Sequence, residues 1–305
     1  MSLRAVKQII ETTPTIEGAG VKLQRAFGFG KTKEFDPFLL LDDFRNENPA
    51  DYLAGFPWHP HRGIETITYV LAGEVEHGDS LGNKGKMGAG DVQWMTAGSG
   101  ILHQEMPRGD QHGRMHGFQL WANLPAALKM TAPRYQDIPS TAIPEVTEDD
   151  GTRARVICGD FWGTQGPVSG VATESSVAAR YVDISVPPGK RKRIQVETTR
   201  NAFAYVFAGA GAFRDASGPQ AVLTESGADP NAPAVYDAKN HSLVLFDQGD
   251  EIVVQAGPDG IRFLLVSGQP LEEPVAWYGP IVMNTQAELR QAMNELQTGK
   301  FIRHP

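Results

Sequence analysis

Cysteine is almost absent from this sequence, and hydrophobic segments of membrane-spanning length are missing altogether. The single thiol, Cys158, excludes an intrachain disulfide, is typical of a reducing compartment, and is interpreted as an inert core residue. The first seven residues lack the apolar stretch of a signal peptide, and no apolar run could cross a bilayer. We therefore expect a cytoplasmic protein without a membrane partner.

Positive charge is also scarce. The net charge is −8 and the pI is about 5.5, whereas non-specific nucleic-acid binding needs a basic surface. The one tight basic run, residues 190–193, directly follows Pro187-Pro188-Gly189 and is interpreted as a solvated turn. Direct binding to nucleic acid is thus not expected, while the acidity leaves a protein partner open.

Long helical patterns are rare, and short runs of alternating apolar residues bounded by glycine take their place. The chain of 305 residues contains 33 glycines and 21 prolines, a composition that favours many strands joined by tight turns. The runs predict an all-β protein of antiparallel barrels. They are residues 64–71, 74–77, 91–95, 116–122, 181–186, 203–207, 242–246, 252–255 and 261–266.

A proline-rich stretch separates two halves of similar texture. Proline at that density blocks helices and central strands, so we place a domain boundary there, giving domains of residues 1–139 and 140–305. Two segments of the second half, residues 205–209 and 247–252, echo residues 69–73 and 88–92, which suggests a weak internal duplication. The second copy has no histidine in these segments.

One helix is predicted near the C-terminus. Thr285 and Glu288 have the spacing of a capping box, in which each side chain accepts from a backbone N–H at the helix start. Leu289, Met293 and Leu296 follow on one face, and Gly299 is placed to end the helix. We expect this helix to pack on the outside of a barrel.

Histidines are concentrated between residues 59 and 116. In a strand, residues i and i+2 point to the same face, so His59 and His61 present two imidazoles together, and His103 and Glu105 present an imidazole and a carboxylate. Two such pairs on neighbouring strands would converge on one divalent ion, and this donor set suits Fe, Mn, Ni, Cu or Zn. An octahedral ion would keep two positions for O2 and a substrate oxygen. The alternative is a set of purely structural histidines.

Glu65 is a competing carboxylate. It follows His61 by four residues and is expected to face the same way, so it could replace Glu105 as the fourth ligand. We prefer Glu105 as ligand and assign Glu65 an outer role, orienting an imidazole or moving a proton. Other histidines and tryptophans near this segment are interpreted as strand-edge, loop, core or pocket residues. They are His77, His112, His116, Trp58, Trp94 and Trp121.

Several long segments resemble the pirin family, and the resemblance covers nearly the whole chain. The central segment contains His59-Pro60-His61-Arg62-Gly63-Ile64-Glu65-Thr66, and a second one ends in Gly98-Ser99-Gly100-Ile101-Leu102-His103-Gln104-Glu105. The other segments are residues 35–44, 88–97, 115–121, 273–275 and 278–285.

The resemblance implies a bicupin, with two antiparallel β-barrels and one metal in the first. The family's ligands fall on His59, His61, His103 and Glu105. Iron is the expected ion, with Mn, Ni, Cu, Co and Zn as alternatives. The second barrel is expected to be metal-free, because Ile194 and Val196 lie near where ligands would be.

Two functions are attributed to this family. One is a quercetin 2,3-dioxygenase activity, in which O2 opens the ring of a flavonol and CO is released, with Glu105 or Glu65 as the proton acceptor. The other is regulation, in which an iron-dependent redox switch binds a transcription factor or a metabolic enzyme. We prefer the enzyme, whose partners would be a small aromatic substrate and O2, and we expect a monomer.

Overall fold

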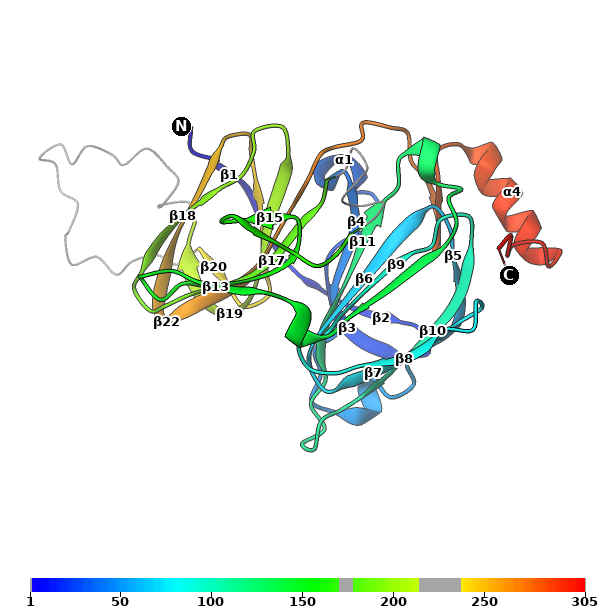
Figure 1. Ribbon diagram of the computed structural model, residues 1–305, viewed down its shortest axis with the longest axis horizontal. Helices are drawn as coiled ribbons and strands as arrows, with labels where there is room; N and C mark the ends of the chain where they lie inside the picture. Colours follow the sequence, from blue (N-terminus) through cyan, green and yellow to red (C-terminus); the bar gives the residue numbers. More distant parts are fainter. Residues whose placement is uncertain (1, 170–177, 214–236, 305) are drawn as a thin grey trace, which may run out of the picture.

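Two antiparallel β lobes lie side by side in the computed structural model, which describes residues 2–169, 178–213 and 237–304 (Figure 1). The N-terminal lobe contains a seven-stranded sheet, in the order β12-β9-β6-β11-β4-β3-β2, and a four-stranded sheet, in the order β5-β10-β7-β8. Its strands are β2 (Thr13–Glu17), β3 (Val21–Phe27), β4 (Phe38–Asp43), β5 (Phe56–His61), β6 (Ile64–Ala72), β7 (Glu74–Asp79), β8 (Lys84–Met87), β9 (Val92–Thr96), β10 (Ile101–Arg108), β11 (His116–Asn123) and β12 (Arg134–Ile138). A short helix, α1 (Thr32–Phe35), precedes β4.

The C-terminal lobe is built on a nine-stranded sheet, in the order β1-β21-β19-β22-β17-β14-β13, with β18 and β20 on branches. The long strand β22 pairs with β18 through its first part and with β17 through its last, so the sheet curves around an apolar core. Its strands are β1 (Val6–Glu11), β13 (Glu145–Thr147), β14 (Arg153–Cys158), β17 (Arg180–Val186), β18 (Arg191–Gln195), β19 (Asn201–Ala212), β20 (Ala238–Lys239), β21 (Ser242–Phe246) and β22 (Glu251–Gly268). A small hairpin, β15 (Asp160–Phe161) and β16 (Thr164–Gln165), lies beside it.

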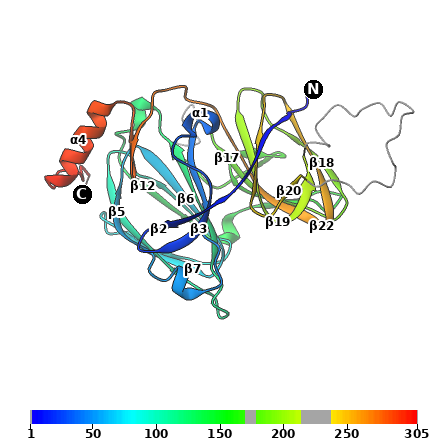
Figure 2. The same ribbon diagram turned by 180° about the vertical axis from the view of Figure 1, so that it is seen from behind.

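Each end of the chain crosses to the opposite lobe. Strand β1 pairs with β21, so the N-terminal segment extends the C-terminal sheet before the chain enters its own lobe (Figure 2). After β22 the chain returns to the N-terminal lobe as the hairpin β23 (Ala276–Tyr278) and β24 (Ile281–Met283), followed by helix α4 (Gln286–Gln297). Val282 of β24 packs with Ile64 and Ile101 of that lobe. The domain boundary between residues 139 and 140 stays a prediction. Strand β1 pairs with a strand from beyond that boundary, and β24 packs on residues that precede it.

The strands β6, β11 and β4 lie between the pocket and the C-terminal lobe. Side chains alternate along a strand, so one face of these strands lines the pocket and the other packs against that lobe. On one face, Thr68, Gln119 and Asp42 line a pocket inside the N-terminal lobe. On the other face, Tyr69 and Phe118 pack with Tyr181, Phe203 and Tyr205 of the C-terminal lobe in one continuous core. The apolar side of β11, formed by Phe118, Leu120 and Ala122, is therefore the side that joins the lobes.

The all-β fold and the C-terminal helix are confirmed. The capping box is formed: the Thr285 side chain accepts from the Glu288 backbone at 3.2 Å, and the Glu288 carboxylate accepts from the Thr285 backbone at 2.8 Å. Gly299 follows the helix with φ +72°. Cys158 is buried, and its thiol donates to the Ala179 carbonyl at 3.2 Å.

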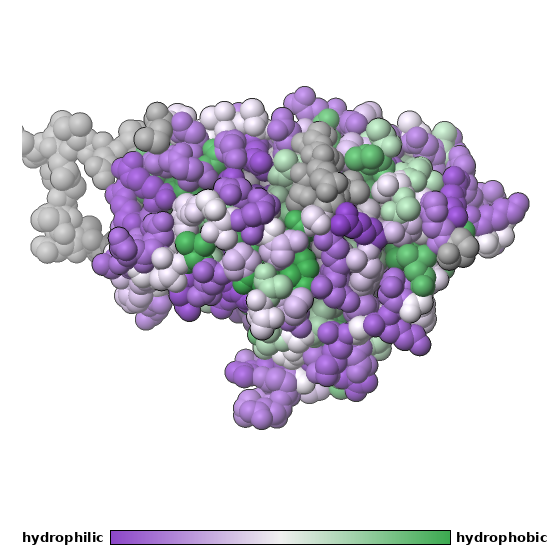
Figure 3. Space-filling view, viewed as in Figure 1, coloured by the Kyte–Doolittle hydropathy of each residue, from purple (hydrophilic) through white to green (hydrophobic). Residues whose placement is uncertain are grey.

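The basic run is only partly the solvated turn that was predicted. Residues from Arg191 onward form β18, and the Lys192 side chain is 10% exposed because its ammonium pairs with Glu148 at 2.5 Å and Asp150 at 3.0 Å. Lys192, which the sequence pattern predicted to be solvated, is therefore buried together with two acidic partners. On the face shown in Figure 3, hydrophilic residues predominate and apolar residues form small separate groups. No helix within the described ranges is long and apolar enough to cross a membrane.

Candidate metal centre

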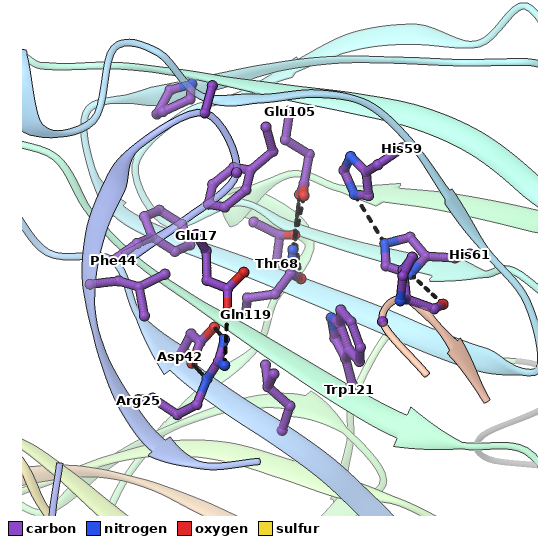
Figure 4. Close-up of a pocket in the computed structure, with 18 of the residues that line it drawn as sticks. Glu17, Arg25, Asp42, Phe44, His59, His61, Thr68, Glu105, Gln119 and Trp121 are labelled. Carbon is purple, nitrogen blue, oxygen red and sulfur yellow. Dashed lines mark hydrogen bonds and ion pairs between the residues drawn. The ribbon is translucent and has the colours of Figure 1, made fainter. Parts of the chain in front are cut away.

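Three histidines converge inside the N-terminal lobe. Strands β5 and β10 pair antiparallel with His59 opposite His103, and His61 lies on the same face of β5 as His59. The ring centroids of His59 and His103 are 4.3 Å apart, and one ligand nitrogen from each of the three rings lies within 4.8 Å of the others. Figure 4 shows two of these rings, His59 and His61, at the wall of the pocket. The predicted i, i+2 arrangement therefore brings three imidazoles to one point.

Hydrogen bonds fix which nitrogen of two rings faces this point. His59 Nδ1 lies 2.9 Å from the Pro57 carbonyl oxygen, and His61 Nδ1 lies 3.2 Å from the Pro280 carbonyl oxygen. A carbonyl only accepts, so each Nδ1 must donate and each Nε2 carries a lone pair. These two Nε2 atoms face each other at 3.1 Å. Two lone pairs at that distance repel unless a cation is shared, and nitrogen ligands on one first-row ion, with bonds of about 2.0–2.1 Å, have a similar separation.

His103 adds a second sign of a bound cation. Its side chain is buried, and neither ring nitrogen has a hydrogen-bond partner among the described residues. Burial, together with the neighbouring histidines, holds the pKa of His103 well below its usual value, and burial does the same for His61. Neutral imidazole is the form that binds metal, so the residues present fit a divalent ion.

Glu105 lies next to the histidines in the same pocket but is held by other partners. The Thr68 hydroxyl donates to Oε1 at 2.9 Å, and the Gln119 amide donates to Oε2 at 2.9 Å. The register between β10 and β5 shifts between His103 and Glu105, and the carboxylate is outside the group of ligand atoms that lie within 4.8 Å of one another. Its role as the fourth ligand stays a prediction.

Glu65 does not lie with the histidines. Gly63, with φ +78°, turns the chain between β5 and β6, so the alternation of β5 does not continue to Glu65. Its side chain lies on the face of β6 opposite Thr68, where Oε1 accepts from the Thr96 hydroxyl at 2.6 Å. Burial raises the pKa of Glu65 to about 7, and Oε2 has no partner within the described ranges.

A cavity of about 560 Å³ opens from the histidines. Trp121 lines it, whereas Trp94 is buried in the core and Trp58 is 54% exposed. The other residues that line the cavity were not predicted from the sequence, because they come from several segments that are distant from one another in the chain. The lining includes Leu23, Leu40, Phe44, Phe56, Val75, Pro107, Trp277 and Pro280.

The other histidines of this segment are outside the group of three converging rings, although His77 lies opposite Glu105 on the paired strands β7 and β10. His77 is buried and lies 2.7 Å from the Tyr135 hydroxyl, whereas His112 is exposed in a loop. His116 lies at the join between the lobes, where Arg45 donates to it at 3.1 Å.

Comparison with known proteins places the whole chain in one family. Residues 20–122 match the Pirin family, and residues 181–302 match the Pirin C-terminal cupin domain. A pirin-like protein of Caulobacter vibrioides is 43% identical over 303 residues, which are 99% of this chain and 100% of the relative. The chain belongs to the pirin family.

Solved structures have the same fold as this pirin over most of its length, and both lobes are cupin domains. A quercetin 2,3-dioxygenase from Acinetobacter baumannii superposes with a TM-score of 0.84 at 30% identity, covering 98% of this chain and 99% of that one. The bacterial pirin YhhW from Escherichia coli, in complex with nickel(II), shares the fold with a TM-score of 0.59 at 20% identity, covering 86% and 99% of the two chains.

Proposed function

We propose that this pirin is a metal-dependent dioxygenase that opens the heterocyclic ring of flavonols such as quercetin, with release of CO. The observation that carries the proposal is the histidine centre at the wall of a largely apolar cavity of about 560 Å³, large enough for a flat aromatic molecule. The solved structure of a quercetin 2,3-dioxygenase, 30% identical over nearly the whole chain, supports it.

His59, His61 and His103 would hold the metal, with Glu105 proposed as the fourth ligand. Iron is the proposed ion; nickel, which YhhW binds, is an alternative, as are Mn, Cu, Co and Zn. When bound, the ion would act as a Lewis acid that activates the flavonol towards O2.

The chain's own groups would position the substrate and accept its proton. Trp121 lies against His61 with ring centroids 5.0 Å apart, so an aromatic ring beside the centre would pack on its indole. The apolar walls exclude water from that ring. Glu105 would accept the proton of the flavonol hydroxyl, and its bonds from Thr68 and Gln119 hold the carboxylate in place.

The test is turnover under matched metal loading. Metal content is measured by mass spectrometry, and quercetin consumption is followed with O2 uptake and CO detection for each candidate ion. One bound ion with metal-dependent CO release would support the proposal, and a His59→Ala/His61→Ala variant should lose both. One bound ion without turnover under any metal would refute it and favour the regulatory function, in which this pirin binds a transcription factor or a metabolic enzyme.

A further inference from the structure

The pocket has a second polar end, built from three neighbouring strands. Arg25 of β3 forms a two-pronged ion pair with Asp42 of β4, with Nε to Oδ1 at 2.8 Å and the terminal nitrogen to Oδ2 at 2.7 Å. Its other terminal nitrogen lies 2.8 Å from the carboxylate of Glu17 on β2. All three side chains line the cavity that also contains His59 and His61, on its other side (Figure 4).

Fold stability alone accounts poorly for this pair. The Asp42 side chain is 7% exposed, and burial raises the pKa of Asp42 to about 6 although Arg25 is bound to it. Desolvating two charges costs about as much as their attraction returns, so a pair of apolar side chains would serve the sheet equally well. Arg25 and Asp42 are also direct cross-strand neighbours, which is the purely structural explanation that an experiment must exclude.

The chemistry of this end selects one type of ligand group. An added anion would lie against Asp42 and Glu17, and an added cation would lie against Arg25. A hydroxyl avoids both conflicts, because it can donate to a carboxylate oxygen and accept from the guanidinium at the same time. Between the two ends the walls are largely apolar, and the polar exceptions are Thr68, Gln119 and Glu105 (Figure 4). The apolar wall residues are Leu23, Leu40, Phe44, Phe56, Val75 and Trp121.

We propose that the Arg25–Asp42 pair binds a ring hydroxyl of a polyhydroxylated aromatic substrate whose other end lies at the histidines. This inference rests on the proposed function and narrows its substrate class: flavonols hydroxylated on the ring remote from the metal are preferred over those without such a group. Arg25 and Asp42 are then specificity-determining residues, because each would touch the substrate away from the bonds that break.

The experiment compares two flavonols on two proteins. Quercetin carries ring hydroxyls, whereas 3-hydroxyflavone keeps the metal-binding hydroxyl and ketone and lacks the others. Both are titrated into the nickel-loaded protein without O2, so that no turnover occurs, and binding is followed by quenching of tryptophan fluorescence. The variant Arg25→Met/Asp42→Leu replaces both partners by apolar groups of similar size, which avoids leaving one buried charge.

We expect quercetin affinity to fall about 10- to 100-fold in the variant, the usual effect of losing hydrogen bonds to charged groups. Affinity for 3-hydroxyflavone should change by less than about twofold, which also shows that the variant pocket is folded. Asp42→Asn keeps a hydrogen-bond acceptor but loses the charge, so its quercetin affinity should lie between those of the wild type and the double variant. Lys22→Met on the outer face of β3, where an exposed pair with Asp51 is lost, is the matched control and should bind both ligands normally.

Equal losses for both flavonols would overturn the inference and make the ion pair structural. Unchanged quercetin affinity in the variant would overturn it as well, while leaving the proposed dioxygenase activity in place. If neither flavonol binds the wild-type protein loaded with any of the candidate ions, both proposals fail together. Because binding is measured without O2, a protein that binds selectively but never releases CO would refute only the enzymatic function.

Discussion

Replacing His103 with leucine should have different effects on the free energy of unfolding in the metal-free and the metal-bound protein. In the metal-free protein, both ring nitrogens of His103 are buried without a partner among the described residues. An unsatisfied buried polar group costs about 1–3 kcal/mol, so removing two of them offsets much or all of the packing lost on substitution. We therefore expect metal-free His103→Leu to be at least as stable as the metal-free wild type.

Adding metal should reverse this order. A ligand that binds only the folded state stabilises it by about 4.1 kcal/mol when its concentration is 1,000 times its dissociation constant. The wild type should gain stability of that order with excess nickel, and His103→Leu should gain none. The measurement is urea unfolding followed by circular dichroism, after chelation and then with nickel added.

A matched control is available in His112→Leu, which removes an exposed histidine of a loop and should keep the full gain from nickel. Two results would refute the reasoning. A nickel-dependent gain in His103→Leu would show that His103 is not a ligand. A loss of more than about 2 kcal/mol in the metal-free variant would show that its buried ring has a structural role.

Three further expectations follow from the buried groups. The folded pKa of Glu65, about 7, is above its unfolded value of about 4.3, so between these two pH values the folded state holds a proton that the unfolded state has released. The free energy of unfolding therefore falls as the pH rises from about 4.3 to about 7. Glu65→Gln should thus raise the free energy of unfolding by roughly 3 kcal/mol at pH 8 and by little at pH 4, and should leave metal content and turnover unchanged because Glu65 lies outside the pocket. Gln119→Leu removes a donor to Glu105 and should weaken metal affinity about 10- to 100-fold in chelator competition, if Glu105 is a ligand. Glu295→Ala leaves the buried Arg62 guanidinium without its carboxylate partner at 2.7 Å and should cost about 3–5 kcal/mol in urea unfolding, with faster proteolysis at α4.

Local patterns predicted much of this protein, because alternation along a strand and the spacing of a capping box depend only on near neighbours. The convergence of His59, His61 and His103 follows from two such patterns meeting on paired strands. Glu65 was misplaced because the expected alternation was carried across Gly63, where the backbone turns. A glycine between two strand-like runs was the available signal.

Features that depend on contacts between distant segments could not be predicted in this way. Trp277 and Pro280 reach the pocket only because the chain returns from the C-terminal lobe, and nothing local to those residues indicates it. The pairing of Arg25 with Asp42 depends on the register of two strands. Lys192 is buried because Glu148 and Asp150 approach it from a loop more than forty residues earlier.

The crossing of both chain ends has a consequence for any attempt to study the lobes separately. A fragment ending at residue 139 would keep His59, His61 and His103 but would lose the Pro280 carbonyl that orients His61 and the Trp277 wall of the pocket. A fragment beginning at residue 140 would lose β1 from its sheet. If the halves arose by duplication, each has since become part of the other's architecture, so damage to the last segment of the chain should be detected first as a loss of metal from the first lobe.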